Sequence, residues 1–468
     1  MEFRAAVSAA VDALEPYLRA AERGEGPAVV LPPLGAVSES LELRRWIRDG
    51  GMDANALGRF LASYLSLTTR VGHPAELAHQ VAVPDVPAAI GDLVHGITNN
   101  PMAIYEMGPA AATIEVEVVA WMLEQIGFDP GAAGGVLTHG GSLANLTALL
   151  AARARAAPQA WQRGAPSDLS LLATPAAHYS LSRAAAILGL GTDAIVALPT
   201  DDLDRLDPGR LHEGLTASRA AGRRPFALVA AACATGTGLH DDVTAAAAFC
   251  REHGIWLHVD AAHGASGLLS PRFRTLLAGI DQADSVIWDA HKLLRVAGLC
   301  AAVLVRDATA LDHAFQQQAS YLFYDRDSEG VDLLSRTVEC TKAALGLKLF
   351  LELAARGECG LGEDVAARYD VAHQAWELLC SHEAFSCPYE PETNILCFRA
   401  DGDDDHQLLV RDRLMADGDV HLSSTLIGGR RHLRIVVTSP ATTRATLERT
   451  IERIASCSRA ILDNRSHG

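Results

Sequence analysis

Several common sequence signatures are missing from this chain of 468 residues. Its nine cysteines are odd in number and include no CxxC pair, which argues against a disulfide framework and against a zinc site. We therefore expect reduced thiols, a cytoplasmic location and no metal. Basic residues number 40 against 57 acidic ones, and the formal charge of −17 argues against a nucleic-acid partner because no basic surface would attract phosphates.

Long apolar runs and targeting signals are missing as well. No stretch is long and apolar enough to cross a bilayer, so we expect no membrane partner. Residues 1–26 have neither the basic start nor the continuous apolar core of a signal peptide, and they predict an amphipathic helix instead. Aromatic residues make up only 5% of the chain but hydrophobic residues 49%, which is ordinary for a globular α/β enzyme with a large core.

Three segments with different hydrophobic patterns divide the chain. Residues 1–85 predict an N-terminal arm of helices separated by Gly and Pro breaks. Residues 86–345 predict a large α/β domain, because short apolar runs alternate there with glycine-marked turns and helices. Such alternation is typical of a mostly parallel sheet with ligand loops at the C-terminal ends of its strands. The runs that predict strands are VLTHGG, LSLLATPAAHYS, AIVALPTD, FALVAAACATGTG, IWLHVDAAHGA, SVIWDAHKLL and CAAVLVRD.

The C-terminal part shows a mixed pattern. Residues 346–468 predict a small α+β domain that begins with long helical periodicity. Two strand-like segments follow, NILCFRA and HLRIVVTSP, and a closing helix is expected over 441–461.

Lys292 lies in the segment SVIWDAHKLL, where it follows an apolar strand and a short DAH loop. A lysine in that position can be held against an apolar pocket, which keeps its amine available for a carbonyl. Considered alone, an exposed lysine at the edge of a strand is the more common arrangement. The other motifs change this balance.

Asp260 ends the run IWLHVD, a strand apolar enough to be central in the sheet. A carboxylate there needs a partner, and a protonated pyridine nitrogen is one that would keep the ring electron-withdrawing. The small residues Ala261 and Ala262 would leave room for a flat ring. The alternative is a buried aspartate that accepts hydrogen bonds from backbone amides.

The segment THGGSLANLTALLAARA predicts a glycine turn that opens a helix. Its first turn presents Ser142 and the backbone amides of Gly141 and Leu143. Unpaired amides and the helix dipole suit a phosphate group. An ordinary helix N-cap is the alternative, and for an isolated GGS turn it is the more common one.

Further polar residues follow other predicted strands. His178 stands between a strand and a helix, where its imidazole is placed to stack on a ring or to make a satisfied helix-entry hydrogen bond. His291, with Asp289 beside it, is placed to contact a phosphate or to orient Lys292. Thr235 belongs to the turn CATGTG, whose hydroxyls either contact a cofactor or support the turn.

Together, HGGSLANL, the strand before His178, ATGTG, HVDAAHGA and DSVIWDAHKLL resemble the group II decarboxylases dependent on pyridoxal 5'-phosphate (PLP). That family includes glutamate, cysteine sulfinate, aromatic amino acid and 2,4-diaminobutyrate decarboxylases. The resemblance extends from about residue 71 to the C-terminus and takes in NNPMAIYEMGPAAATIE, QQASYLF and CTKAALGLKLF. It implies PLP fold type I, with a seven-stranded type of sheet in the large domain. It also implies an obligate homodimer with residues from both subunits at each site, so QQASYLF is expected to serve the partner subunit.

The resemblance also implies roles for individual residues. Lys292 would carry the cofactor as a Schiff base, Asp260 would pair with the pyridine nitrogen, and His178 would stack on the ring. The other implied cofactor contacts are Gly141, Ser142 and His291 at the phosphate, Thr235 near the cofactor, and Ala262 on the second face of the ring. Gln80, Asn99 and Asn100 resemble the region that shapes the substrate pocket, and Arg434 aligns with an arginine that meets the substrate carboxylate.

Two departures from the family pattern affect the loop around the lysine. The loop has DAHK where many members have NPHK or DPHK, and Gly298 replaces an apolar side chain. Both put the local loop shape and the substrate in doubt, while EPETNILCF resembles the glutamate and cysteine sulfinate branch.

We therefore expect decarboxylation of an L-α-amino acid with an acidic or polar side chain to its amine and carbon dioxide. Another PLP reaction at Cα is the first alternative: a lyase, an aminotransferase or a decarboxylation coupled to oxidative deamination. A scaffold that has lost activity is the second. It is disfavoured by the presence of Lys292, Asp260 and His178 together.

Overall fold

The computed structural model describes residues 1–316 and 330–466. Its contacts divide the chain into two compact units. The larger unit comprises Gln80–Tyr369 with Ile427–Gly429, and the smaller one comprises Met1–His79, Asp370–Leu426 and Arg430–Gly468. The predicted division into 1–85, 86–345 and 346–468 is a different partition of the chain, and it stays a prediction.

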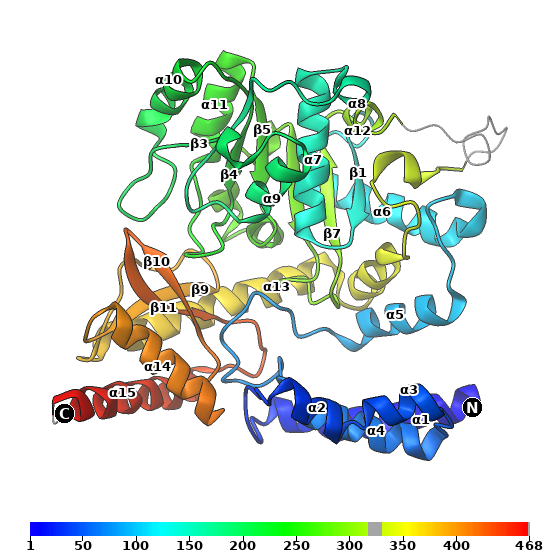
Figure 1. Ribbon diagram of the computed structural model, residues 1–468, viewed down its shortest axis with the longest axis vertical. Coiled ribbons are helices and arrows are strands. Elements are labelled where there is room, and N and C mark those ends of the chain that lie inside the picture. Colours follow the sequence, from blue (N-terminus) through cyan, green and yellow to red (C-terminus); the bar gives the residue numbers. More distant parts are fainter. Residues whose placement is uncertain (317–329, 467–468) are drawn as a thin grey trace. The chain divides into compact units, whose positions relative to one another are not determined.

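A seven-stranded sheet forms the centre of the larger unit, in the order β1-β7-β6-β5-β4-β2-β3 (Figure 1). All seven predicted strands are present, and the mostly parallel α/β sheet is confirmed. The exception is β7, which is antiparallel to both β1 and β6 because the short connection after β6 leaves no room for a helical crossover. The strands are β1 (Gly134–Thr138), β2 (Leu169–Ala173), β3 (Ile195–Ala197), β4 (Arg224–Ala231), β5 (Trp256–Asp260), β6 (Ser285–Asp289) and β7 (Ala301–Val305).

Helices cover both faces of this sheet. Leu228 and Leu257 belong to the strand side chains that pack with α6, α10 and α11, whereas Val229 and Trp256 belong to the alternate set, which packs with α7, α9 and α12. This alternation with period two gives β4 and β5 two buried faces. The helices are α5 (Val86–Thr98), α6 (Pro109–Ile126), α7 (Gly141–Ala156), α8 (Ala160–Arg163), α9 (Ser180–Ile187), α10 (Leu211–Ala220), α11 (Val243–His253), α12 (Thr309–Ala314) and α13 (Leu345–Ser381).

The smaller unit combines helices with a sheet in the order β10-β11-β9-β8. The predicted helices of residues 1–85 and the strands NILCFRA and HLRIVVTSP (β9 and β11) are confirmed. Two strands were not predicted, since β8 has only two residues and β10 is largely polar. The elements are α1 (Phe3–Glu22), α2 (Leu34–Ser40), α3 (Leu43–Asp49), α4 (Ala54–Ser66), β8 (Phe385–Ser386), β9 (Ile395–Ala400), α14 (Asp404–Asp417), β10 (Ser423–Ile427), β11 (Arg430–Val436) and α15 (Arg444–Ser466). Among the helices described, none has the length and hydropathy needed to cross a membrane.

A buried ion pair supports β1. Glu115 of α6 and Lys342 lie 3.2 Å apart and are both fully buried. Glu115 accepts the backbone N–H of Leu137 at 3.0 Å, and Lys342 donates to the Leu137 carbonyl. Burial raises the pKa of the Glu115 carboxyl, while the Lys342 charge acts in the opposite direction. Removing one partner of such a pair costs about 3–5 kcal/mol, so the pair fixes the strand that leads into the glycine turn.

Candidate active site

The C-terminal ends of five strands meet at one edge of the sheet. Strands β2, β4, β5 and β6 are parallel, and β1 shares their direction because the intervening β7 is antiparallel to both of its neighbours. The segments that follow these strands, or their last residues, supply Gly141, His178, Thr235, Asp260 and Lys292. Loops at such an edge surround a common ligand site.

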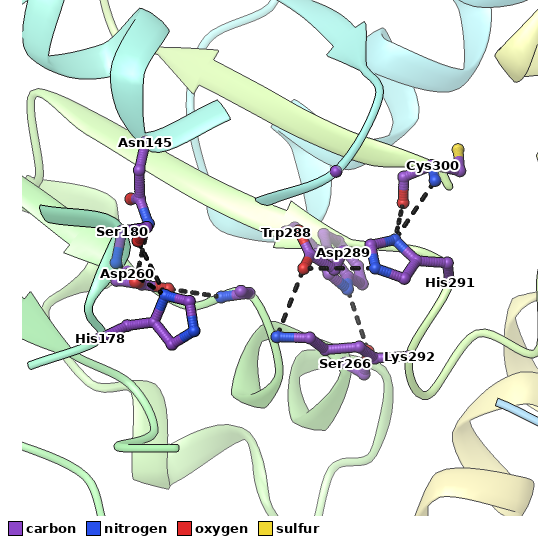
Figure 2. Close-up of polar contacts among 12 residues, drawn as sticks. Asn145, His178, Ser180, Asp260, Ser266, Trp288, Asp289, His291, Lys292 and Cys300 are labelled. Carbon is purple, nitrogen blue, oxygen red and sulfur yellow. Dashed lines mark hydrogen bonds and ion pairs between the residues drawn. The ribbon is translucent and has the colours of Figure 1, made fainter. Parts of the chain in front are cut away.

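The Lys292 side chain folds back onto the end of β6 (Figure 2). Its Nζ lies 3.3 Å from Asp289 Oδ2, and only 16% of the side chain is exposed. Its backbone N–H donates to the Asp289 carbonyl at 3.2 Å. The alternative of an exposed surface lysine is therefore wrong. The chain has just two other lysines, Lys342 and Lys348, and each is buried in an ion pair elsewhere.

Asp289 is the last residue of β6, and its carboxylate is almost completely buried. Burial raises the pKa of this carboxyl, while Lys292 and His291 act in the opposite direction. In the part of the chain that the structure describes, its Oδ1 has no hydrogen-bond partner. A Cβ on Gly141 would lie 2.7 Å from Asp289 Oδ2, so only glycine lets the turn after β1 approach this carboxylate so closely.

Asp260 ends β5, which is an interior strand of the sheet as predicted. Its Oδ2 accepts an N–H from Asn145 Nδ2 at 3.0 Å, and its Oδ1 accepts the backbone N–H of Ala262 at 3.3 Å (Figure 2). The alternative, a carboxylate that accepts hydrogen bonds from backbone amides, thus accounts for only one of the two donors to Asp260. Neutral donors stabilise a carboxylate without cancelling its charge, so Asp260 can still attract a cation.

His178 lies between β2 and α9 and is partly buried. Its Nδ1 lies 2.8 Å from Ser180 Oγ and accepts the Ser180 backbone N–H at 3.3 Å. Burial lowers the pKa of His178, although the Asp260 carboxylate acts in the opposite direction. The helix-entry hydrogen bond expected as an alternative therefore exists at Nδ1, while Nε2 has no hydrogen bond within the described ranges 1–316 and 330–466.

The glycine turn after β1 leads directly into α7. Gly140 adopts a φ of 100°, which a residue with a side chain would rarely take. Among the described residues, the backbone N–H groups of Gly141 and Ser142 meet no acceptor, whereas that of Leu143 donates to the Gly140 carbonyl at 3.1 Å. The prediction that Leu143 presents an unpaired amide is therefore wrong, because the chain tightens into a short turn there. Two free amides at a helix N-terminus remain for an anion.

Three other predicted cofactor contacts border the same sheet edge. Thr235 lies in the turn that follows β4. Ala262 follows β5 and packs among apolar side chains of β1, β6, β7 and α7. His291 Nδ1 lies 2.8 Å from the Cys300 carbonyl oxygen, and this contact directs His291 Nε2 toward Asp289 Oδ2, 3.8 Å away.

Residues 82–85 hold the loop that carries the lysine (residues 290–300, the lysine loop). Ala82 N–H donates to the His291 carbonyl at 3.4 Å, and Asp85 N–H donates to the Arg295 carbonyl at 3.0 Å. Arg295 in turn donates from Nε to the Val83 carbonyl at 3.2 Å and forms an ion pair with Asp85. We call this set of contacts the clasp.

Gln80 stands two residues before the clasp. Its Nε2 is buried and lacks a hydrogen-bond partner among the described residues. A buried amide donor without an acceptor costs about 1–3 kcal/mol. A ligand with an acceptor group would remove that penalty.

The other predicted substrate residues are Asn99, Asn100 and Arg434. Asn99 ends α5 with a φ of 47°, and both Asn99 and Asn100 are exposed. Arg434 belongs to the smaller unit, where it is buried and donates from Nη1 to the Ala78 carbonyl at 2.9 Å and to Ser423 Oγ at 3.1 Å. Arg434 is therefore not an exposed surface residue. The QQASYLF segment lies outside the described residues.

Sequence reasoning missed three buried residues near the predicted ones: Asn145 contacts Asp260, Ser180 contacts His178, and His258 contacts Asn145. Asn145, His258 and Ser180 are each at most 1% exposed. His258 stands two residues before Asp260 on β5, so both face the same side of the strand. Asn145 lies one helical turn after Gly141 in a row of small and apolar residues, and a polar residue at that position was the available signal.

Comparisons with known proteins identify the family of this chain. Residues 63–401 match a family model described as the pyridoxal-dependent decarboxylase conserved domain. Human cysteine sulfinic acid decarboxylase is 32% identical over 402 residues, which cover 81% of each chain. L-2,4-diaminobutyrate decarboxylase of Rhizobium meliloti (strain 1021) is 30% identical over 404 residues, 84% of this chain and 79% of that protein. The crystal structure of Oryza sativa TDC with PLP and tryptamine superimposes with a TM-score of 0.90 at 25% identity, covering 98% of both chains.

Proposed function

Since the chain belongs to the pyridoxal-dependent decarboxylase family, we propose that its substrate is an L-α-amino acid with an acidic or polar side chain. The reaction class follows from the family: the protein is an enzyme, a PLP-dependent carboxy-lyase that converts an amino acid to an amine and carbon dioxide. The other PLP reactions and the inactive scaffold are not supported by these relatives.

The residues at the sheet edge carry the kinds of group that would hold PLP. The free amides of Gly141 and Ser142 suit its phosphate, and the carboxylate of Asp260 suits a protonated ring nitrogen. Ala262 and His178 would flank its flat ring. PLP bound there supplies an electron sink for the pair left behind when carbon dioxide departs.

The remaining tasks fall to the side chains of the chain itself. Lys292 would provide the amine that holds the cofactor, and Asp289, 3.3 Å from its Nζ, would hold a proton beside that nitrogen. Asp260 would keep a proton at the ring nitrogen. His291 would orient toward the phosphate or the lysine, and Thr235 would contact the cofactor.

The observation that carries the substrate proposal is the buried, unpaired Nε2 of Gln80, because an acidic or polar side chain brings the acceptor that this donor lacks. Arg434, buried and cationic, is proposed to meet the substrate carboxylate. Asn99 and Asn100 are proposed to complete the pocket. One relative is named as acting on cysteine sulfinate, which supports an acidic substrate. Another is named for diaminobutyrate, which supports a polar substrate.

Incubation of the holoenzyme with the common amino acids, cysteine sulfinate and diaminobutyrate tests this proposal. Carbon dioxide release and product masses are recorded for each. We expect turnover with glutamate, aspartate, cysteine sulfinate or another polar substrate, and little with leucine or phenylalanine. A preference for apolar or aromatic substrates would contradict the assignment of Gln80 and Arg434.

Lys292 is tested by reduction of the holoenzyme with borohydride and peptide mass analysis. With only three lysines in the chain, the cofactor should be found on the peptide of Lys292 alone. Lys292→Ala should lose both the cofactor absorbance and turnover. Lys348→Arg, which preserves charge at a lysine paired with Asp92, is the matched control and should keep both.

We further propose a cytoplasmic homodimer. No disulfide joins any of the nine cysteines, all of which lie in the described ranges, as expected in a reducing compartment. Helix α5 exposes an apolar stripe at helical spacing that a second copy would cover; its members are Val86, Ile90, Leu93, Val94 and Ile97. Light scattering should give the mass of a dimer, and Ile90→Glu with Ile97→Glu should shift it toward the monomer.

A further inference from the structure

A chain of hydrogen bonds through buried side chains ends at Asp260. It begins at Trp256 on β5, whose Nε1 donates to Ser285 Oγ at 2.8 Å. Ser285 Oγ lies 2.8 Å from His258 Nδ1, and His258 Nε2 lies 2.7 Å from Asn145 Oδ1. Asn145 Nδ2 then donates to Asp260 Oδ2 at 3.0 Å. We call these residues the relay.

The strand geometry explains why the relay forms. Trp256, His258 and Asp260 alternate along β5, so their side chains share one face, and that face packs against α7. Asn145 comes from α7, and Ser285 is the residue of β6 directly opposite His258. Trp256, His258, Asn145 and Ser285 are nearly or fully buried, so water does not compete for the bonds among them, whereas Asp260 is partly buried.

The two ends of the relay fix the direction of every bond. An indole N–H can only donate, and an ionised carboxylate can only accept. Asn145 must therefore turn its amide NH₂ toward Asp260 and its oxygen toward His258. His258 then carries its proton on Nε2, and its bare Nδ1 accepts the Ser285 hydroxyl, which receives the Trp256 N–H. Burial lowers the pKa of His258 to about 4, in agreement with a neutral ring.

A branch joins the relay to His178. The second hydrogen of Asn145 Nδ2 is donated to Ser180 Oγ at 2.9 Å (Figure 2). The Ser180 hydroxyl therefore has its own hydrogen free for His178 Nδ1, 2.8 Å away. The Asn145 amide thus fixes the orientation of both the Asp260 carboxylate and the His178 imidazole. A rotation of that amide by half a turn would break all three of its hydrogen bonds.

We propose that Asn145 is the positioning residue that sets Asp260 and His178 together, and that His258, Ser285 and Trp256 hold its amide in the required orientation. The inference rests on the proposed roles of Asp260 at the ring nitrogen and His178 at the ring face. Asn145 touches neither substrate nor cofactor in this scheme. It acts by keeping a carboxylate and an imidazole in place, and misplacement of such groups lowers turnover by as much as a hundredfold.

The first experiment replaces the amide. Asn145→Ala removes it, and Asn145→Asp keeps its shape but loses the two N–H donors. Both should lower kcat about tenfold to a hundredfold with KM changed less than about threefold. Thr147→Val is the matched control, because this residue is also buried on α7 but, among the described residues, its hydroxyl bonds only to the Leu143 carbonyl. It should leave kcat unchanged.

A second readout reports the ring nitrogen itself. PLP with an isotopically labelled ring nitrogen is bound to each protein, and NMR follows the protonation of that nitrogen as the pH is raised. In wild type and Thr147→Val it should stay protonated. In the Asn145→Ala variant it should lose its proton at lower pH, because Asp260 is no longer held in place.

A second pair of variants protects the test against misfolding. His258→Gln retains an N–H donor near the position of Nε2, whereas His258→Phe retains the ring volume without the donor. We expect the glutamine variant to keep kcat within about threefold of wild type and the phenylalanine variant to lose about tenfold. Circular dichroism and thermal unfolding identify any variant that fails to fold. The test of the inference then rests on the other variant of that pair.

The inference is overturned if the Asn145 variants match Thr147→Val in both kcat and ring-nitrogen protonation, or if His258→Phe equals His258→Gln. Its failure differs from failure of the proposed function. If Lys292→Ala kept cofactor absorbance and turnover, the cofactor assignment would fall, whatever the Asn145 variants did. If Lys292 behaves as proposed and only the Asn145 variants match the control, the positioning role of Asn145 alone is wrong.

Discussion

Asp260 and Asp289 end two neighbouring parallel strands, yet their surroundings differ. Asp260 accepts hydrogen bonds from two neutral donors, the side chain of Asn145 and the backbone of Ala262. Asp289 lies beside a lysine amine and an imidazole, and one of its oxygens has no partner within the described residues. A carboxylate held by neutral donors keeps its attraction for a cation that arrives from outside. The first aspartate is therefore suited to a ligand, and the second to the protein's own amine.

The largest effect is expected from Asp260→Asn. The variant keeps the shape of the side chain but loses the charge that would hold a proton on the ring nitrogen, so kcat should fall about a thousandfold, or about 4 kcal/mol. Steady-state kinetics measure this loss. Asp289→Asn should lose much less, and equal losses at both positions would remove the distinction between the two carboxylates.

The relay behind Asp260 should also appear in the acid stability of the protein. Burial lowers the pKa of His258 to about 4, below its ordinary value of 6.5. The unfolded chain therefore binds this proton between those two values and the folded chain does not, so stability falls as the pH drops through that window. The loss should be roughly 3 kcal/mol for this group. Urea unfolding of wild type and His258→Gln across the window isolates it, and parallel curves would show that His258 is charged in the folded protein.

Asp289 should show the opposite dependence on pH. Burial raises the pKa of its carboxyl, so its contribution to stability is present below the ordinary carboxyl value and is lost as the pH rises through the folded value. The asparagine of Asp289→Asn cannot ionise. The free energy of unfolding of this variant should therefore rise by about 1–3 kcal/mol relative to wild type as the pH rises through this range. Chemical unfolding of the cofactor-free proteins measures the difference. A gain that grew toward acid pH would contradict the buried, unsatisfied state of Asp289.

The smallest effect distinguishes the relay from ordinary packing. Trp256→Phe and Trp288→Phe each remove one buried indole N–H that donates to a serine, Ser285 or Ser266. Each should cost about 1 kcal/mol of stability. Only the Trp256 variant should also lower kcat, by a few-fold, because only that bond belongs to the relay. Equal kcat values in the two variants would limit the relay to His258 and Asn145.

The sequence predicted the sheet and the groups at its edge because those features depend on local pattern. Apolar runs before glycine turns identified all seven strands of the large sheet, and Lys292 and Asp260 stood out as polar residues at strand ends. The direction of β7 was not predictable from its own residues, since it depends on the length of the connection before it. The unpaired amide assigned to Leu143 failed because the first turn of α7 is tighter than an α-helix.

The relay shows a second limit of sequence reasoning. Asn145 and His258 are 113 residues apart, and either alone is an ordinary buried polar residue. Their roles depend on α7 packing over the correct face of β5. The alternation Trp256, His258, Asp260 was visible in the sequence, but the partner on α7 was not.

The clasp joins segments that are far apart in the chain: Arg295 Nε and the Val83 carbonyl are separated by 212 residues. Contacts of such high sequence separation form late because a long loop must close first. During synthesis, residues 82–85 leave the ribosome long before the lysine loop does, and the loop cannot be secured until that whole span has emerged. Refolding experiments should therefore recover helical circular dichroism before cofactor absorbance returns. The contacts that secure the lysine loop are thus among the last that a new chain acquires.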